Sequence, residues 1–134
     1  MDTLILLKPD VVRKNYIGKI LAKFEENGFK IKRLKMLTLN RDEASDFYSV
    51  HKNKSFFSEL VDFITSGPIV AAIIEGDNAI ERVRELIGST KPSEAKIGTI
   101  RREFGSSITE NAIHASDSHE SFIREVRVVF PDYS

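Results

Sequence analysis

His114 is the residue of this sequence whose neighbours best suit covalent chemistry. It follows an apolar pair and precedes a polar run in which Asp117 and Glu120 form a capping-box pattern, which predicts a short helix that begins near Ser118. A helix N-terminus favours an anion and disfavours imidazolium, and neutral imidazole is the nucleophilic form of histidine. We therefore expect His114 to act beside an anion-binding site.

The other two histidines have simpler interpretations. His51 lies among charged residues on a predicted helix and His119 lies in a polar run, so we expect both to be solvated. His114, Asp117 and His119 also resemble a partial metal site, but their spacing is irregular and no further ligand is evident, so no zinc is expected. The chain has no cysteine, which excludes disulfides and thiol nucleophiles.

A phosphate-binding site in this chain would need a local cluster of cations. The segment 89–111 has weak periodicity and is long for an irregular loop in a compact domain, so we expect it to be functional. Arg84 precedes it, and its own basic residues are Lys91, Lys96, Arg101 and Arg102. Lys8, at the end of the first predicted strand, could lie at a solvated edge or project into the same site. No G-x-x-x-x-G-K-S/T and no G-x-G-x-x-G segment occurs, so a P-loop or Rossmann turn is excluded.

Phe56 and Leu60 form a candidate apolar clamp. They are four residues apart on a predicted helix and are offset from the face that Phe57, Val61 and Ile64 share. One interpretation is a helix buried on two sides. The other is a surface on which a flat base stacks, which would tolerate any base because it reads no base edge.

The bulk composition indicates one ordinary globular domain. The chain has 134 residues, of which 41% are hydrophobic and 30% charged, with a formal net charge of +0. A protein that grips a long polyanion normally has a basic excess, so we do not expect nucleic acid as a partner. The N-terminal apolar stretch is too short to span a membrane, and we expect a cytoplasmic protein.

The hydrophobic patterns predict an α+β fold. Strands are expected at 3–8, at 29–39 with a bulge near Arg33, at 69–75 and at 126–130, and helices at 17–27, 40–51, 55–66 and 77–87. This order is the split β-α-β arrangement repeated twice. We therefore predict a ferredoxin-like βαββαβ sandwich with a four-stranded antiparallel sheet, helices on one face, an added helix pair and a long basic loop.

Five segments in order along the chain resemble the motifs of the nucleoside diphosphate kinase family. Its active-site signature, N-x-I/V-H-G-S-D-S, is similar to Asn-Ala-Ile-His-Ala-Ser-Asp-Ser at 111–118. The others are K-P-D at 8–10, F-F with S-G-P at 56–57 and 66–68, G-x-T-x-P at 88–92, and G-T-I-R at 98–101. The resemblance runs from about Thr3 to Phe130 and implies a single nucleoside diphosphate kinase domain over residues 1–134.

This resemblance implies a ping-pong reaction in which a nucleoside triphosphate, mainly ATP, phosphorylates His114 and a nucleoside diphosphate then collects the phosphate. Mg²⁺ is expected to arrive with the nucleotide. The implied nucleotide-binding residues are Arg84, Thr90 and Arg101 on the phosphates, Lys8 and Asn111 on the phosphates and the sugar 3′-hydroxyl, and Phe56 with Leu60 on the base. Tyr48 and Ser116 are expected to support the site. Glu125 is expected to hydrogen-bond the other nitrogen of His114 and so fix its tautomer.

The sequence departs from the family pattern at several positions. Ala115 replaces the usual glycine, which would cost about 1 kcal/mol if the position requires a positive φ. Arg102 replaces a small residue and is expected to add charge near the phosphates; Val11, Ser55 and Ile97 also differ from the common residues. The chain ends soon after its last predicted strand, whereas the longer tails of some members contact neighbouring subunits. A homo-oligomer is expected, with hexamer and tetramer both open.

Two other functions fit parts of the sequence. A binding or regulatory module with weak turnover would explain Ala115 and Arg102. Binding of single-stranded nucleic acid through the basic loop is the other, and the zero net charge argues against it.

Overall fold

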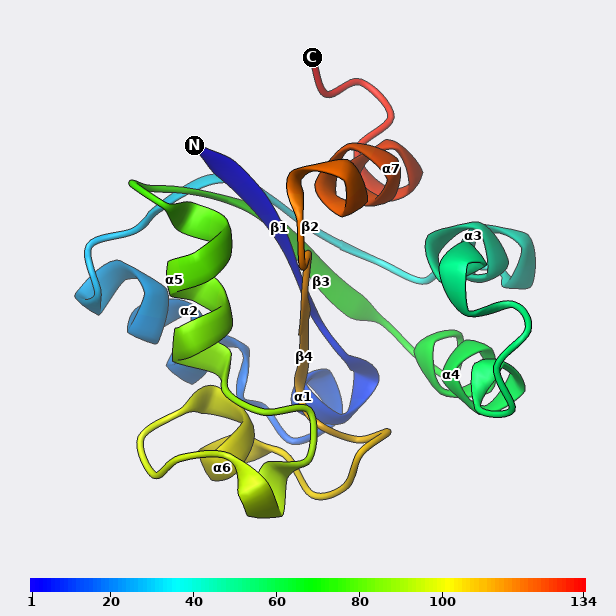
Figure 1. The fold of residues 1–134 in the computed structure, drawn as a ribbon, viewed down its shortest axis with the longest axis horizontal. Helices are drawn as coiled ribbons and strands as arrows, with labels where there is room; N and C mark the ends of the chain where they lie inside the picture. Colours follow the sequence, from blue (N-terminus) through cyan, green and yellow to red (C-terminus); the bar gives the residue numbers. More distant parts are fainter.

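The computed structural model describes residues 1–134 and is built around a four-stranded antiparallel sheet. The strands are β1 (Asp2–Leu7), β2 (Lys30–Leu37), β3 (Ile69–Glu75) and β4 (Ile113–Ala115), in the spatial order β2-β3-β1-β4. In Figure 1 they run through the centre of the molecule, with helices on either side. Helical segments connect β1 to β2 and β3 to β4, which gives the predicted ferredoxin-like βαββαβ arrangement.

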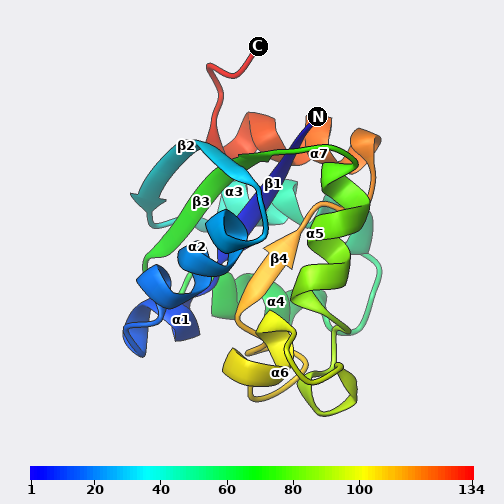
Figure 2. The same cartoon turned by 90° about the vertical axis from the view of Figure 1, so that its left-hand side faces the viewer.

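Helices cover both faces of the sheet, so the prediction of helices on one face was wrong. Helices α2 (Ile17–Glu26) and α5 (Ala79–Ile87) pack on one face, and α3 (Arg41–Phe47), α4 (Phe57–Ile64) and α7 (His119–Val129) lie on the other (Figures 1 and 2). The reason is the central strand β3, whose alternate residues are buried in two separate cores. Val70, Ala72 and Ile74 belong to the first core, and Ile69, Ala71 and Ile73 to the second.

The C-terminal segment is a helix, not the predicted strand at 126–130. The alternation of Val126, Val128 and Phe130 suggested a strand, but the buried residues of the segment follow helical spacing. They are Phe122, Glu125, Val126 and Val129. The helix is capped by Ser118, whose Oγ accepts a hydrogen bond from the backbone N–H of Ser121 at 3.1 Å. The fourth strand is the three-residue β4, which pairs with β1 and places His114 opposite Leu6.

Several local predictions are confirmed. Asn40 and Glu43 form a reciprocal capping box at the start of α3, and β2 shifts register between Ile31 and Arg33. Helix α4 begins at Phe57, two residues later than predicted, so Phe56 occupies the position before its first turn.

Short helices occur in two stretches for which no helix was predicted, residues 9–13 and the segment 89–111. Strand β1 ends at Leu7, and Pro9 then opens α1 (Pro9–Arg13), since proline is tolerated in a first helical turn. The segment 89–111 includes the 3-10 turn η2 (Pro92–Glu94) and α6 (Ile100–Phe104), and a further 3-10 turn, η1 (Ser49–His51), follows α3. No helix of the structure is both long and apolar enough to cross a lipid bilayer.

Candidate active site

One cavity of about 410 Å³ brings together nearly all of the predicted site residues. It lies beside β4, and the elements that line it are far apart in sequence. Among its lining residues are Lys8, Tyr48, Phe56, Leu60, Arg84, Thr90, Arg101, Asn111, His114 and Glu125. Ser116 is the exception: it is buried behind the cavity, where its hydroxyl contacts Glu125.

His114 lies at the middle of β4 with one ring nitrogen engaged. Its Nε2 is 2.9 Å from Oε1 of Glu125, and the ring of Phe47 packs against it edge-on at a centroid distance of 4.9 Å. A carboxylate only accepts hydrogen bonds, so Nε2 carries the proton and Nδ1 keeps its lone pair. The contact therefore leaves Nδ1 as the ring nitrogen with no hydrogen-bond partner from Glu125.

Glu125 is held in place by three donors. It projects from α7 and is buried; its Oε1 also accepts the hydroxyl of Ser116 at 2.8 Å, and its Oε2 accepts Nη2 of Arg124 at 3.3 Å. Tyr48 is buried next to this group, and burial with the nearby Glu125 charge raises the pKa of its hydroxyl far above the ordinary value. Tyr48 therefore stays protonated and uncharged.

Four cations line the cavity: Arg124, which donates to Glu125, and Lys8, Arg84 and Arg101. Lys8, which precedes α1, donates from Nζ to Oδ1 of Asn111 at 2.9 Å, and Asn111 in turn donates to the carbonyl of Thr90 at 3.0 Å. Arg84 of α5 donates to the carbonyl of Ala115 at 3.2 Å. Hydrogen bonds to the Asn111 side chain and to the backbone carbonyl of Ala115 thus fix where these two charges lie.

Arg101 of α6 is the most firmly placed of the cations. It donates to the carbonyls of Gly88 at 3.0 Å and Ile113 at 2.8 Å, while its Nε is buried without a partner. Burial, followed by the neighbouring Arg84, lowers its pKa to about 10. Burial, followed by Arg101, lowers the pKa of Lys8 to about 8, against an opposing effect of Asp10. These cations are poorly compensated, so an anion placed among them would be stabilised.

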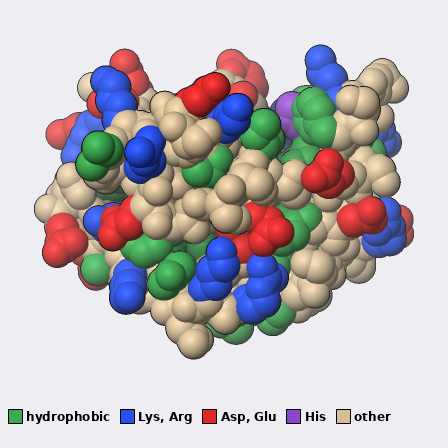
Figure 3. Space-filling view, turned by 90° about the horizontal axis from the view of Figure 1, so that it is seen from below, with side chains coloured by type: hydrophobic (Ala, Val, Ile, Leu, Met, Phe, Trp, Pro, Cys, Tyr) green, Lys and Arg blue, Asp and Glu red, His purple; other side chains and the backbone are tan.

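The other basic residues of the segment 89–111 do not reach the cavity. Arg102 donates to the carbonyls of Ser93 at 3.1 Å and Ala95 at 3.4 Å, so the expectation that it adds charge near the phosphates was wrong. Lys91 and Lys96 line other surface hollows. Around α1 and α6, Figure 3 shows basic and acidic side chains interspersed.

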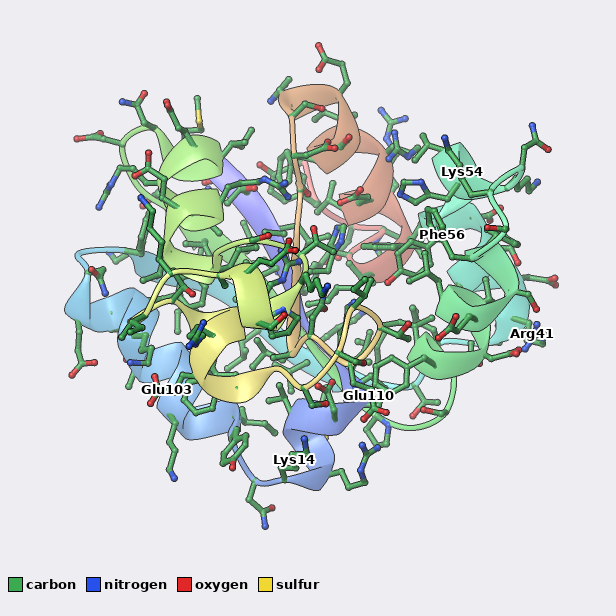
Figure 4. All side chains as sticks on the ribbon, turned by 60° about the horizontal axis from the view of Figure 1, so that its bottom comes forward. Lys14, Arg41, Lys54, Phe56, Glu103 and Glu110 are labelled. Atoms are coloured by element: carbon green, nitrogen blue, oxygen red, sulfur yellow. The ribbon has the colours of Figure 1, made fainter.

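The apolar end of the cavity has a wall that the sequence did not reveal. Phe56 and Leu60 line one side, and Figure 4 shows Phe56 on the side of α4 that faces the centre of the molecule. Ile108, from the loop before β4, also lines the cavity although its side chain is 58% exposed. The sequence offered one signal for this role of Ile108, which is a single apolar residue within a run of Ser, Thr and Glu. Phe56, Leu60 and Ile108 together give this end of the cavity an apolar lining.

His51 is not the solvated surface residue that we predicted. It is half-buried, lines the cavity, and lies against Phe56 with ring centroids 5.5 Å apart. Its Nδ1 is buried without a hydrogen-bond partner. His119 is exposed, as predicted.

The condition under which Ala115 would cost stability, a positive φ, is not met at residue 115, and the positive φ occurs three positions earlier. Ala115 is part of β4 and therefore extended, whereas Ala112 has a φ of +76°. An alanine at position 115 thus carries no conformational penalty. No three His, Cys, Asp or Glu side chains are grouped so that they could hold a metal ion.

Comparison with known proteins gives one consistent result. The family model described as nucleoside diphosphate kinase matches residues 1–134. A nucleoside diphosphate kinase of Staphylothermus marinus is 55% identical over 97% of this chain and 92% of its own length. The crystal structure of the Aquifex aeolicus nucleoside diphosphate kinase is 49% identical, with a TM-score of 0.94 over 96% of this chain and 94% of that one. A Halobacterium salinarum nucleoside diphosphate kinase in complex with CDP is 37% identical, with a TM-score of 0.94 over 98% and 88% of the two chains.

Proposed function

This chain belongs to the nucleoside diphosphate kinase family of phosphotransferases, and we propose that its phosphate passes through Nδ1 of His114. The observation that carries the proposal is the hydrogen bond between Nε2 of His114 and Glu125, at 2.9 Å, which leaves Nδ1 with its lone pair. Because His114 also lines the cavity that Arg84 and Arg101 line, a nucleophile and its charge-neutralising groups meet in one place.

The proposed reaction has two steps: a phosphate is transferred from a nucleotide to His114, and then from His114 to a second nucleotide. The lone pair of Nδ1 forms a bond to the γ-phosphorus of a nucleoside triphosphate as the bond to the β–γ bridging oxygen breaks, and the nucleoside diphosphate leaves. A second nucleoside diphosphate then attacks with its terminal phosphate oxygen, and the P–N bond breaks. Positive charge that develops on the ring during the first step is balanced by Glu125 through Nε2. Arg84 and Arg101 neutralise the charge spread over the transferring oxygens.

The remaining lining residues hold the nucleotide. Lys8 and Asn111 form a linked pair of polar groups suited to the phosphates and the sugar hydroxyl, and Thr90 continues this chain of hydrogen bonds. Phe56, Leu60 and Ile108 provide an apolar site for the base. Since none of the three can read a base edge, we propose that the enzyme accepts purines and pyrimidines alike.

Mg²⁺ is proposed to enter as part of the substrate. It is a hard cation that prefers oxygen ligands, and nucleotide phosphates supply them, as in other sites for phosphate transfer. The cations that line the cavity bind the remaining phosphate charge. A cytoplasmic location is also proposed, because a reducing compartment with free nucleotides fits a chain that has no cysteine.

The exposed edge of the sheet is the basis on which we propose a homo-oligomer. Strand β2 is the last strand on one side, and it exposes Leu34 (53%) and Met36 (57%). An edge strand with exposed apolar side chains favours pairing with another chain unless it is covered. A second copy that pairs along β2 would cover both residues.

Labelling of the protein tests the role of His114. Incubation with γ-labelled ATP and Mg²⁺ should give an acid-labile, base-stable label that GDP removes with formation of GTP. His114→Asn should abolish both labelling and turnover, and the exposed His119→Asn serves as the matched control. Label retained in His114→Asn would contradict the assignment.

A further inference from the structure

The backbone just before His114 makes a tight turn with a strained centre. The N–H of Ile113 donates to the carbonyl of Asn111 at 2.9 Å, and Ala112 between them has its φ of +76°. These features define the rare γ-turn with a positive φ, which a residue other than glycine adopts only when its surroundings hold it there. Asn111 and His114 flank the turn, and both line the cavity. The shape of this turn therefore sets how the two side chains face a nucleotide.

Both polar groups of Ala112 are bound by residues that follow β1. The backbone N–H of Lys8 donates to the carbonyl of Ala112 at 2.9 Å. The N–H of Ala112 donates to Oδ2 of Asp10 at 3.1 Å. Asp10 and Ala112 are both completely buried, so removal of this carboxyl would leave the N–H of Ala112 without its partner inside the fold, which is costly.

The carboxyl of Asp10 makes no hydrogen bond to any other residue, although its charge also acts on Lys8. Its Oδ1 is buried without a hydrogen-bond partner, and Asp10 does not line the cavity. Burial raises its pKa, so the fold accepts a costly buried acid at this position. A costly buried acid whose one hydrogen bond to another residue is made to Ala112 indicates a role for that bond.

We propose that Asp10 is a positioning residue for phosphate transfer, because its carboxyl holds the strained turn at Ala112 that orients Asn111 and His114. The role rests on the proposed function. It differs from the roles of Lys8 and His114 because Asp10 touches no substrate: its carboxyl holds the backbone at Ala112, and its charge acts on Lys8. It also differs from a role in the stability of α1 alone, since the hydrogen bond of Asp10 joins α1 to Ala112, directly before the strand β4 that carries His114.

The experiment compares Asp10→Ala, Asp10→Asn, Ala112→Gly and the double variant Asp10→Ala/Ala112→Gly. Ile20→Ala, a core change on α2, is the control for lost stability without a change at the site. Two quantities are measured: the single-turnover rate of His114 phosphorylation at saturating ATP, and the hydrogen-exchange protection of the residue 112 amide. The second readout does not depend on activity.

Three results are expected. Asp10→Ala should lose protection at residue 112 and slow phosphorylation by on the order of tenfold to a hundredfold, since small misplacements of reacting groups have effects of that size. Asp10→Asn should recover most of the rate, because its amide oxygen can still accept the N–H of Ala112. Ala112→Gly should lessen the effect of Asp10→Ala, because glycine adopts a positive φ without strain. Ile20→Ala should keep the parent rate.

Other results overturn the role of Asp10. They are a parent-like rate in Asp10→Ala, a loss no larger than that of Ile20→Ala, or a loss unchanged by Ala112→Gly. If Asp10→Ala does not fold, the same measurements on Asp10→Ser, whose side chain is polar but shorter, decide in its place. An inactive parent protein would contradict the proposed function itself, whereas an active parent with an equally active Asp10→Ala contradicts only this inference.

Discussion

The hydroxyl of Thr109 donates a hydrogen bond of 2.8 Å to Oε1 of Glu59. Thr109 belongs to the loop before β4 and follows Ile108 directly, while Glu59 lies on α4 within one turn of Phe56. The bond therefore ties together the two walls of the apolar site, and it exists before any nucleotide binds. A wall fixed in advance reduces the ordering cost of binding.

Loss of this bond should weaken nucleotide binding without slowing the chemical step. A hydrogen bond of this kind contributes about 1 kcal/mol, so Thr109→Val should raise the Kd for ADP by roughly fivefold. Calorimetric titration measures the change, and Thr38→Val, at an exposed position away from the cavity, is the control. An unchanged Kd would show that the two walls are held by other contacts.

Removal of the charge on Glu125 should slow phosphorylation of His114 more than removal of the Ser116 hydroxyl that bonds to Glu125. Glu125→Gln keeps a group that can bond to Nε2 but loses the charge that balances the ring, so the rate should fall by on the order of a hundredfold. Ser116→Ala removes one neutral hydrogen bond and should cost roughly fivefold. Rapid-quench measurement of the phosphoenzyme tests this order, with the exposed Glu120→Gln as the control; equal losses for Glu125→Gln and Ser116→Ala would contradict it.

The low pKa of Lys8 predicts opposite effects of alkaline pH on binding and on stability. As the pH rises through about 8, Lys8 loses the charge that favours a phosphate, so the KM for the nucleotide should rise. The unfolded chain still holds this proton up to the ordinary pKa of 10.5, so between these two pH values deprotonation in the folded state adds to stability. Lys8→Met should remove the alkaline rise in KM. If the KM of Lys8→Met still rises at alkaline pH, the rise is due to the titration of another group.

Phe56 should contribute equally to the binding of all bases. Stacking on an aromatic side chain contributes roughly 1–3 kcal/mol and does not depend on base edges. Phe56→Ala should therefore raise the Kd of ADP, GDP, CDP and UDP by similar factors, of roughly fivefold or more. An effect confined to the purines would indicate that the site distinguishes bases.

A charge on the exposed edge strand should disrupt the proposed oligomer. Met36→Glu would place a carboxylate where a second copy pairs along β2, and like charges opposed across a pair of copies are unfavourable. Sedimentation velocity should then show smaller particles than the parent protein forms, while Asn53→Glu, at an exposed position outside β2, serves as a control for charge alone. A monomeric parent would contradict the oligomer itself.

The sequence by itself determined the features that depend on neighbours along the chain. The capping pair of Asn40 and Glu43, the bulge near Arg33 and the buried strand β3 were all readable, because each follows from local spacing and side-chain type. The resemblance to the family likewise identified ten of the residues that line the cavity, since the order and spacing of its motifs fix which positions of this chain correspond to the family pattern.

The tertiary structure decided the features that depend on contacts between distant segments. Residues 126–130 alternate like a strand, but they belong to a helix because the second core buries Val126 and Val129 together with Phe122. His51 and Ile108 both lie in polar stretches of the sequence. Only the fold brings them to the cavity, His51 from the turn η1, where it packs against Phe56, and Ile108 from the loop before β4. The strain at Ala112 has the same origin: its partner Asp10 is 102 residues away, and no local pattern encodes a contact made by the pairing of β1 with β4.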